Sequence, residues 1–176
     1  MKFHQTGLPG AYLIELELLE DERGFFARTF CREEFAARGL NPEVSQCNLS
    51  YNARKNTLRG MHYQAEPHAE AKLVNCLKGA VYDVIIDLRP RSSTSGRWVA
   101  VELSAANRKM LYVPEGFAHG FLTLEDDTAV HYQMSAFFEP DSARGVRWDD
   151  PAFGIEWPCP EPIISDKDQR WPDYKR

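Results

Sequence analysis

The segment from Leu58 to Gln64 combines cationic, titratable and hydrogen-bonding side chains, and Lys72 follows His62 after ten residues. Polar and apolar residues alternate along the segment, which is typical of a strand with one polar face. The alternation predicts two faces, one with Arg59 and Met61 and the other with Gly60, His62 and Gln64. Arginine and lysine bind phosphate, and histidine exchanges protons near neutral pH, so these residues suit chemistry on an anion. Taken alone, the segment fits a basic surface strand with one ordinary histidine equally well.

Composition limits the classes of protein that fit this chain. Its 176 residues suit a single domain spanning 1–176, and 43% hydrophobic residues are enough for a core. The net charge of −5 argues against binding of a nucleic-acid backbone. No apolar run reaches the length of a membrane span, and no signal-peptide core follows the first residues. We therefore expect a cytoplasmic enzyme or binding protein.

Cysteine spacing gives no sign of a metal centre or a disulfide framework. The four cysteines form no C-x-x-C pair and no zinc-ligand spacing; they are Cys31, Cys47, Cys76 and Cys159. In a cytoplasmic chain such cysteines are expected to be reduced packing residues.

Short strand-like segments separated by frequent turn signals predict an all-β fold. The stretches 80–88 and 98–103 are rich in β-branched residues, and Gly, Pro, Asn and Asp clusters bound them. One helix is expected, over 32–38, with Gly39 ending it. The tail from Asp149 is rich in proline and tryptophan and is expected to be extended coil. The pattern favours an antiparallel sandwich or barrel with minor short helices over a parallel sheet.

The segment Tyr112 to Phe121 contains a Pro-x-Gly-x-x-His turn, which many small β-barrels of the cupin class share. In metal-binding cupins this histidine, here His119, joins an earlier His-x-His pair and a glutamate. The earlier segment here runs His62 to Gln64 without a second histidine, and a metal site needs three or more well-placed ligands. His68 is a candidate third ligand, but it lies in a loop expected to be exposed. No metal site is therefore predicted.

Two further segments gain meaning only in combination with the others. Tyr132 alternates with apolar neighbours in 130–135, and 164–168 ends in the charged run that includes Asp168. Alone, the first is typical of a core or rim tyrosine and the second of a solvated turn.

Together these segments follow the order and spacing of one family. The chain resembles the dTDP-4-dehydrorhamnose 3,5-epimerases from about Gly10 to Asp168. The motifs that carry the resemblance are 21–26, 46–50, 58–64, Lys72-Leu73, 83–89, 114–121, Tyr132, 147–151 and 165–168.

The resemblance implies a fold and a reaction. The fold would be a cupin-like jelly-roll β-barrel, and the protein a homodimer whose N-terminal strands cross to the partner. The reaction would be cofactor-free proton exchange beside the ketone of a nucleotide-diphosphate 4-keto-6-deoxy sugar. His62 would be the general base, oriented by Asp168; Lys72 would stabilise the enolate oxygen; Tyr132 would be the acid on the opposite face of the ring.

The resemblance also implies substrate-binding roles. His119, Asn48 and Gln46 would bind sugar hydroxyls or tune the His–Asp pair. Arg23, Arg59 and Lys167 would hold the diphosphate or neighbouring polar groups.

Three positions depart from the usual pattern of the family. Arg28 stands where a nucleotide-contacting glutamate is usual, Phe138 replaces the tyrosine that stacks on the base, and Ala143 replaces a glutamate of the pocket. Cytosine offers an N3 acceptor that suits an arginine, whereas thymine offers a donor. CDP- or GDP-linked sugars are therefore alternatives to dTDP. Inversion at C3 alone or C5 alone is also an alternative to double epimerisation.

Three other activities compete with the epimerase interpretation. One is a metal-dependent cupin that uses His62 and His119, and the missing His-x-His argues against it. Another is a non-catalytic nucleotide-sugar binder, which would be marked by loss of the base or its partner. The third is a 3,4-ketoisomerase, which the set of Lys72, Tyr132 and Asp168 fits less well.

Overall fold

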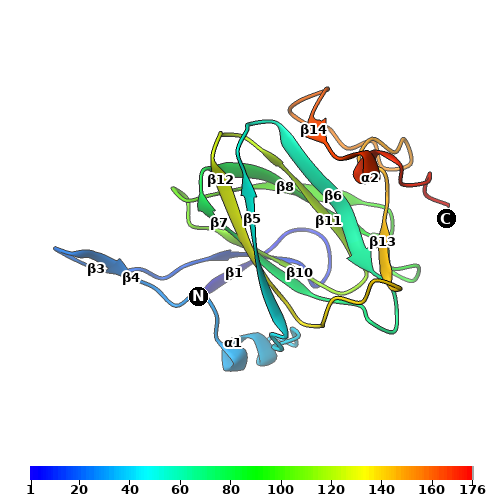
Figure 1. Cartoon of the computed structure of the whole chain (residues 1–176). Coiled ribbons are helices and arrows are strands. Elements are labelled where there is room, and N and C mark those ends of the chain that lie inside the picture. The colour runs from blue at the N-terminus through cyan, green and yellow to red at the C-terminus, as the bar shows by residue number, and fades with distance from the viewer. Residues whose placement is uncertain (176) are drawn as a thin grey trace.

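The computed structural model describes residues 1–175 and consists mainly of strands in two facing sheets (Figure 1). The first sheet has the order β1 (Lys2–Gln5), β2 (Tyr12–Glu15), β10 (Met110–Val113), β7 (Lys72–Lys78), β12 (Thr128–Met134), β5 (Gln46–Asn52). The second has the order β13 (Ala143–Gly145), β6 (Thr57–Gln64), β11 (Phe117–Thr123), β8 (Ala80–Asp87), β9 (Trp98–Ser104), and β14 (Ile163–Ile164) pairs with β6. Every pairing is antiparallel except that of β14, so the predicted all-β jelly-roll class is confirmed.

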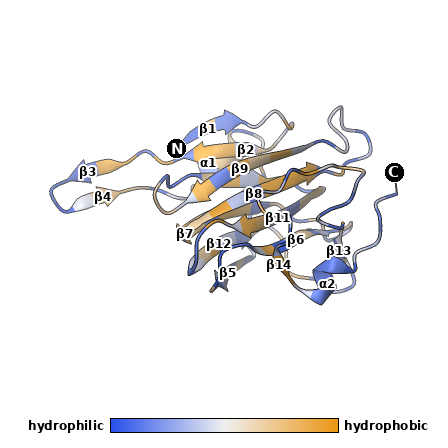
Figure 2. Ribbon diagram, turned by 90° about the horizontal axis from the view of Figure 1, so that it is seen from above, coloured by the Kyte–Doolittle hydropathy of each residue, from blue (hydrophilic) through white to orange (hydrophobic). Residues whose placement is uncertain are grey.

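The main core lies between the two sheets. Alternate residues of each strand point inward, as the two-residue period of a strand requires. The first sheet contributes Val74, Leu111 and Val130, and the second contributes Ile85 and Phe121, all of them buried. Hydrophobic residues follow the strands of both sheets, whereas the C-terminal helix is hydrophilic (Figure 2). Burial of this apolar surface stabilises the barrel that holds the polar residues in place.

A smaller core lies under the helix α1 (Arg32–Ala36), which agrees with the predicted helix. The Phe35 ring packs at 5.4 Å from Phe3 and at 5.7 Å from Tyr112. Gly39 adopts a φ of 70°, a conformation that suits glycine at a helix end.

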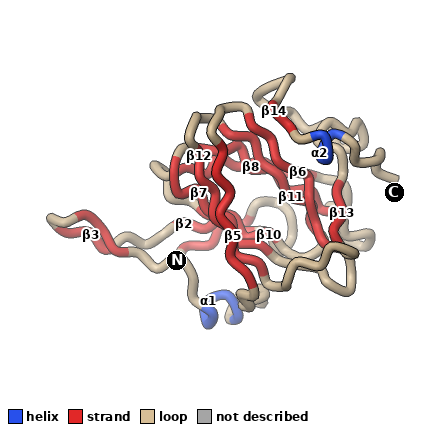
Figure 3. The backbone as a smooth tube through the Cα atoms, in the orientation of Figure 1, coloured by secondary structure: helices blue, strands red, loops and turns tan. Residues whose placement is uncertain are grey.

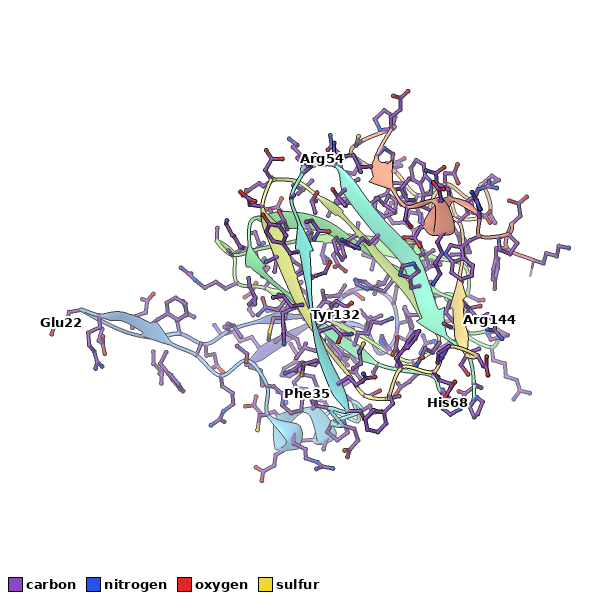
Figure 4. All side chains as sticks on the ribbon, in the orientation of Figure 1. Glu22, Phe35, Arg54, His68, Tyr132 and Arg144 are labelled. Carbon is purple, nitrogen blue, oxygen red and sulfur yellow. The ribbon has the colours of Figure 1, made fainter. Side chains whose placement is uncertain are left out.

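The hairpin of β3 (Leu19–Asp21) and β4 (Gly24–Phe26) projects from the barrel as a two-stranded arm (Figures 1 and 3). Its apolar side chains have little cover in the single chain, because Leu19 is 69% exposed and Phe26 is 70% exposed. Glu22 marks the tip of the arm, well away from the barrel (Figure 4).

The C-terminal tail corrects one expectation. Residues 165–168, which looked like a solvated turn, begin the helix α2 (Asp166–Gln169), and the Ser165 hydroxyl caps its N-terminus by accepting the Asp168 backbone N–H at 3.2 Å. The rest of the tail is mostly irregular, as expected. Within residues 1–175, no helix is long and apolar enough to cross a membrane.

Candidate active site

The candidate site is a hollow between the two sheets at the end of the barrel closed by α2. Two adjoining cavities of about 200 Å³ and about 190 Å³ share three lining residues, His62, Lys72 and Tyr132. These residues come from β6, β7 and β12, so strands of both sheets contribute. Figure 4 shows Tyr132 over the middle of the barrel, whereas His68 lies near its edge.

A bulge in β6 overturns the predicted faces of that strand. His119 of β11 pairs with His62, but Phe121, two residues on, pairs with Arg59, three residues away on β6. One extra residue on β6 shifts the alternation from that point. Arg59 and His62 therefore line the same cavity. Met61 is buried on the opposite face of the second sheet, in a separate hydrophobic cluster.

Gly60 makes this bulge possible. It has a φ of 140°, and a Cβ atom added there would lie 2.5 Å from Cα of Gly120. Both facts exclude a side chain, because L residues rarely adopt that φ and the neighbouring strand leaves no space. The bulge therefore requires glycine at position 60, two residues before His62.

His62 and Asp168 form a hydrogen-bonded pair across 106 residues of sequence. The His62 Nε2 atom lies 2.7 Å from Asp168 Oδ1, and the Gly60 N–H donates to Oδ2 at 3.4 Å. Burial of the carboxyl opposes its ionisation, yet the hydrogen bonds from His62 and Gly60 hold the pKa of Asp168 below its ordinary value. The His62 side chain is 44% exposed, so Nδ1 remains available to a ligand. A carboxylate behind one ring nitrogen orients the imidazole and stabilises its protonated form.

Lys72 supplies a cation at the first position of β7, where it lines both cavities. Its Nζ atom lies 2.9 Å from Glu70 Oε1 and 3.4 Å from the His62 carbonyl oxygen. The residue is only 7% exposed, so its charge is largely shielded from water.

Tyr132 lies on the wall that faces His62. β12 belongs to the first sheet and β6 to the second, and both side chains line the same two cavities. In the first sheet Tyr132 pairs with Asn48 of β5, and Asn48 also lines the larger cavity. An imidazole and a phenol on opposite walls can act on opposite faces of a flat intermediate.

A second histidine–carboxylate pair lies beside the first. His119 Nε2 lies 2.9 Å from Oδ1 and 3.0 Å from Oδ2 of the fully buried Asp83 on β8. Each histidine of the site thus has a carboxylate partner of its own. Over residues 1–175 the structure contains no group of three or more His, Cys, Asp or Glu side chains placed to hold a metal ion.

The rim of the larger cavity carries the other predicted contacts. Phe138, 56% exposed, lines it together with Ala143 and Lys167. Gln46 does not line either cavity; its Oε1 atom accepts the Phe138 backbone N–H and supports the rim segment instead. An exposed aromatic ring at the mouth of a polar cavity is suited to stacking on a planar group.

Besides Gln46, two predicted contacts lie outside the two cavities of the site. Arg23 is at the tip of the hairpin, 85% exposed, and bonds Asp21. Arg28 follows the hairpin and lies 3.7 Å from Glu34 of α1. Arg59, by contrast, lines the smaller cavity and donates from Nε to Asn52 at 2.7 Å.

Comparison with known proteins identifies the family of this chain. The family model described as dTDP-4-dehydrorhamnose 3,5-epimerase matches residues 5–176. The chain belongs to that family. The dTDP-4-dehydrorhamnose 3,5-epimerase of Shigella flexneri is 44% identical over 96% of this chain and 93% of its own.

Solved structures of the family are also similar to this chain. The enzyme of Elizabethkingia anophelis has a TM-score of 0.96 and 41% identity, covering 99% of this chain and 96% of its own. The enzyme of Bacillus anthracis, solved with TDP and pyrophosphate bound, has a TM-score of 0.95 and 41% identity, covering 98% and 99%. The cupin-like jelly roll predicted from the sequence is thus confirmed.

Some lining or supporting residues received no role from the sequence, and three of them stand out. They are Glu70, Asp83 and Trp171. Glu70 precedes Lys72 by two residues, the spacing that puts side chains on one face of a strand, so its sequence position carried a usable signal. Asp83 sits within a recognised motif, but its pairing with His119 depends on the register of β8 and β11. Trp171 packs on Gly145 from a tail without periodicity, which no local pattern predicts.

Proposed function

We propose that this protein is a cofactor-independent nucleotide-sugar epimerase. It inverts C3 and C5 of a nucleotide-diphosphate 4-keto-6-deoxyhexose, in the manner of dTDP-4-dehydro-6-deoxyglucose to dTDP-4-dehydrorhamnose. One observation carries the proposal: the imidazole of His62, backed by Asp168 at 2.7 Å, shares a cavity with the Tyr132 phenol on the opposite wall. Family membership supports the same activity.

The reaction follows from these positions. Nδ1 of His62 removes the proton from a carbon beside the C4 ketone, and the C–H electrons form the C=C bond of an enolate. The Lys72 ammonium stabilises the charge that develops on the C4 oxygen. Tyr132 then donates its phenolic proton to the opposite face of the carbon, which inverts that centre. Proton exchange with solvent returns His62 to its neutral form and Tyr132 to its phenol.

The rim accounts for the remainder of the substrate. Arg59 and Lys167 bring cations to the cavities, and Phe138 offers a ring on which a base can stack. The TDP bound to the Bacillus anthracis relative supports a thymidine nucleotide. The proposal therefore takes dTDP as the nucleotide and makes CDP and GDP arms of the test.

The projecting hairpin supports a homodimer. Its exposed apolar residues need cover, and Arg23 can meet a diphosphate only if the arm reaches the cavity of a second copy. In this arrangement Arg23 and Arg28 complete the partner's site. The four free cysteines support a cytoplasmic location, where thiols stay reduced.

Proton NMR in deuterium oxide with dTDP-, CDP- and GDP-linked 4-keto-6-deoxyglucose tests the proposal. The expected result is deuterium at C3 and C5 of the dTDP sugar, with conversion to the rhamnose configuration, and the same turnover with a chelator present. His62→Asn should abolish exchange, while His68→Asn, which changes an exposed histidine, should leave it intact. Exchange by His62→Asn at the normal rate would overturn the proposed mechanism. A preference for the CDP- or GDP-linked sugar would overturn the assignment of dTDP as the nucleotide. Deuterium at one carbon only would establish single epimerisation.

A further inference from the structure

Glu70 is an unusual neighbour for a site that binds an anion. Four cationic side chains line the two cavities, namely Arg59, Lys72, Arg144 and Lys167, and they suit a diphosphate. Only two carboxylates line these cavities in the described chain, Glu70 and Asp168. Asp168 bonds His62, which leaves Glu70 as the carboxylate that the proposed mechanism does not use.

The partner of Glu70 is Lys72. Its Oε1 atom lies 2.9 Å from the lysine Nζ, and each side chain of the pair is 8% exposed. A carboxylate so deeply buried would be costly without a partner, and it would also repel an anionic ligand. The ion pair removes both penalties and ties the carboxylate to one specific cation.

The backbone between the two residues is fixed. The Ala71 N–H donates to the Ser135 hydroxyl at 2.8 Å, and the Ser135 N–H donates to the Ala71 carbonyl at 3.0 Å. Glu70 and Lys72 flank this clamped residue, and side chains two apart on extended backbone point to the same side. The geometry of the pair is therefore imposed by the sheet.

The ammonium has three N–H donors, and the described contacts use two of them. One is directed to Glu70 and one to the His62 carbonyl oxygen, so the third remains for an oxygen atom in the cavity. A long lysine side chain has many rotamers, and two fixed acceptors restrict it to one position.

We propose that Glu70 is a positioning residue that holds the Lys72 ammonium aimed at the developing C4 enolate oxygen. This inference rests on the proposed function, because it assigns Glu70 to the enolate step. It adds to the site a residue that touches the substrate only through Lys72. The other titratable groups that line the cavities near Lys72 are Arg59, His62 and Tyr63 on β6, His119 on β11, Tyr132 on β12, Arg144 on β13, and Lys167 and Asp168 on α2.

Glu70→Gln tests the proposal, with Glu66→Gln as the matched control. Glutamine keeps the shape and one acceptor oxygen but loses the charge, and Glu66 is an exposed glutamate of the same loop. Steady-state kcat and KM of epimerisation would be measured for each variant. For Glu70→Gln we expect kcat to fall about 10- to 100-fold while KM stays unchanged, because Lys72 loses the charged partner that fixes its position. The affinity of Glu70→Gln for dTDP, and both constants of Glu66→Gln, should match those of the unmodified protein.

Glu70→Asp separates charge from position. It keeps the carboxylate but shortens the side chain, so kcat should fall less than in Glu70→Gln, with KM again unchanged. This variant also serves if Glu70→Gln does not fold. An unchanged kcat in Glu70→Gln, or an equal fall of kcat in Glu70→Asp, would overturn the inference while the proposed function stands. Absence of exchange in the unmodified protein would overturn the proposed function itself.

Discussion

The roles of the side chains at the site depend on which of them have carboxylate partners. His62 and His119 each contact an aspartate, and Lys72 contacts a glutamate, whereas no hydrogen-bond partner of the Tyr132 hydroxyl is found in the described chain. A partnered imidazole is oriented for accepting a proton, and a phenol that faces it is placed to return one. Proton removal and proton delivery are therefore assigned to different side chains.

Tyr132→Phe isolates the second of these steps. The variant keeps the ring that packs against the core but lacks the donor, so His62 still removes the proton and the enolate still forms. Deuterium exchange at the first carbon should persist in NMR, while net inversion falls about 100-fold or more. Equal loss of exchange and inversion would show that Tyr132 acts before or during proton removal.

At the scale of elements, the bulge in β6 decides which side chains face the substrate. The register shift between His119 and Phe121 puts Arg59 and His62 together, and Gly60 permits the approach of the two strands. The hollow between the sheets thus depends on one glycine as much as on the polar residues around it.

Gly60→Ala should therefore disturb both stability and activity. A Cβ atom would lie 2.5 Å from Gly120 Cα in a backbone with a φ of 140°. Gly7→Ala is the matched control, because Gly7 has a φ of 89° but nothing within 4 Å of the added atom. In urea unfolding we expect a loss of about 1–2 kcal/mol for Gly7→Ala from the positive φ alone, and of about 3 kcal/mol or more for Gly60→Ala. Similar losses in the two variants would mean that the strand contact has no importance of its own.

The sequence predicted elements well where the pattern was local. Alternation in 80–88 and 98–103 located β8 and β9, and the helix predicted over 32–38 is present as α1, which ends at Ala36, two residues earlier than expected. It failed at Arg59, because a bulge changes the facing of a strand without changing its composition. It also missed α2, whose single turn depends on the Ser165 cap and on packing against the barrel rather than on a periodic pattern.

At the scale of the whole molecule, the family motifs placed His62, Lys72, Tyr132 and Asp168 in one cavity although 106 residues separate the first from the last. Local periodicity could not have done so, because the register between distant strands brings them together. The position of Arg23 could not be derived from the family motifs or from local periodicity. Its hairpin leaves the barrel that contains the rest of the site (Figure 1).

The proposed homodimer, in which each hairpin reaches the other subunit, can be tested with mixtures of two variants. Arg23→Ala alone should raise the KM for substrate about 10-fold or more through loss of a diphosphate contact, and His62→Asn alone should be inactive. A homodimer of the first variant lacks the arginine at both sites, and one of the second lacks the base at both. If each hairpin serves the other subunit, a mixed dimer contains one site with both residues intact.

The two variants would be unfolded together and refolded as an equal mixture, and activity measured at a substrate concentration too low for Arg23→Ala to act. Random pairing of symmetric subunits should restore about one quarter of the normal activity. A mixture of His62→Asn with the double variant is the control, and it should stay inactive because no intact site can form. If the activity of the mixture is no greater than the sum of the activities of the two variants alone, Arg23 does not contribute to the partner's site. The hairpin then has no part in binding the substrate of the other subunit.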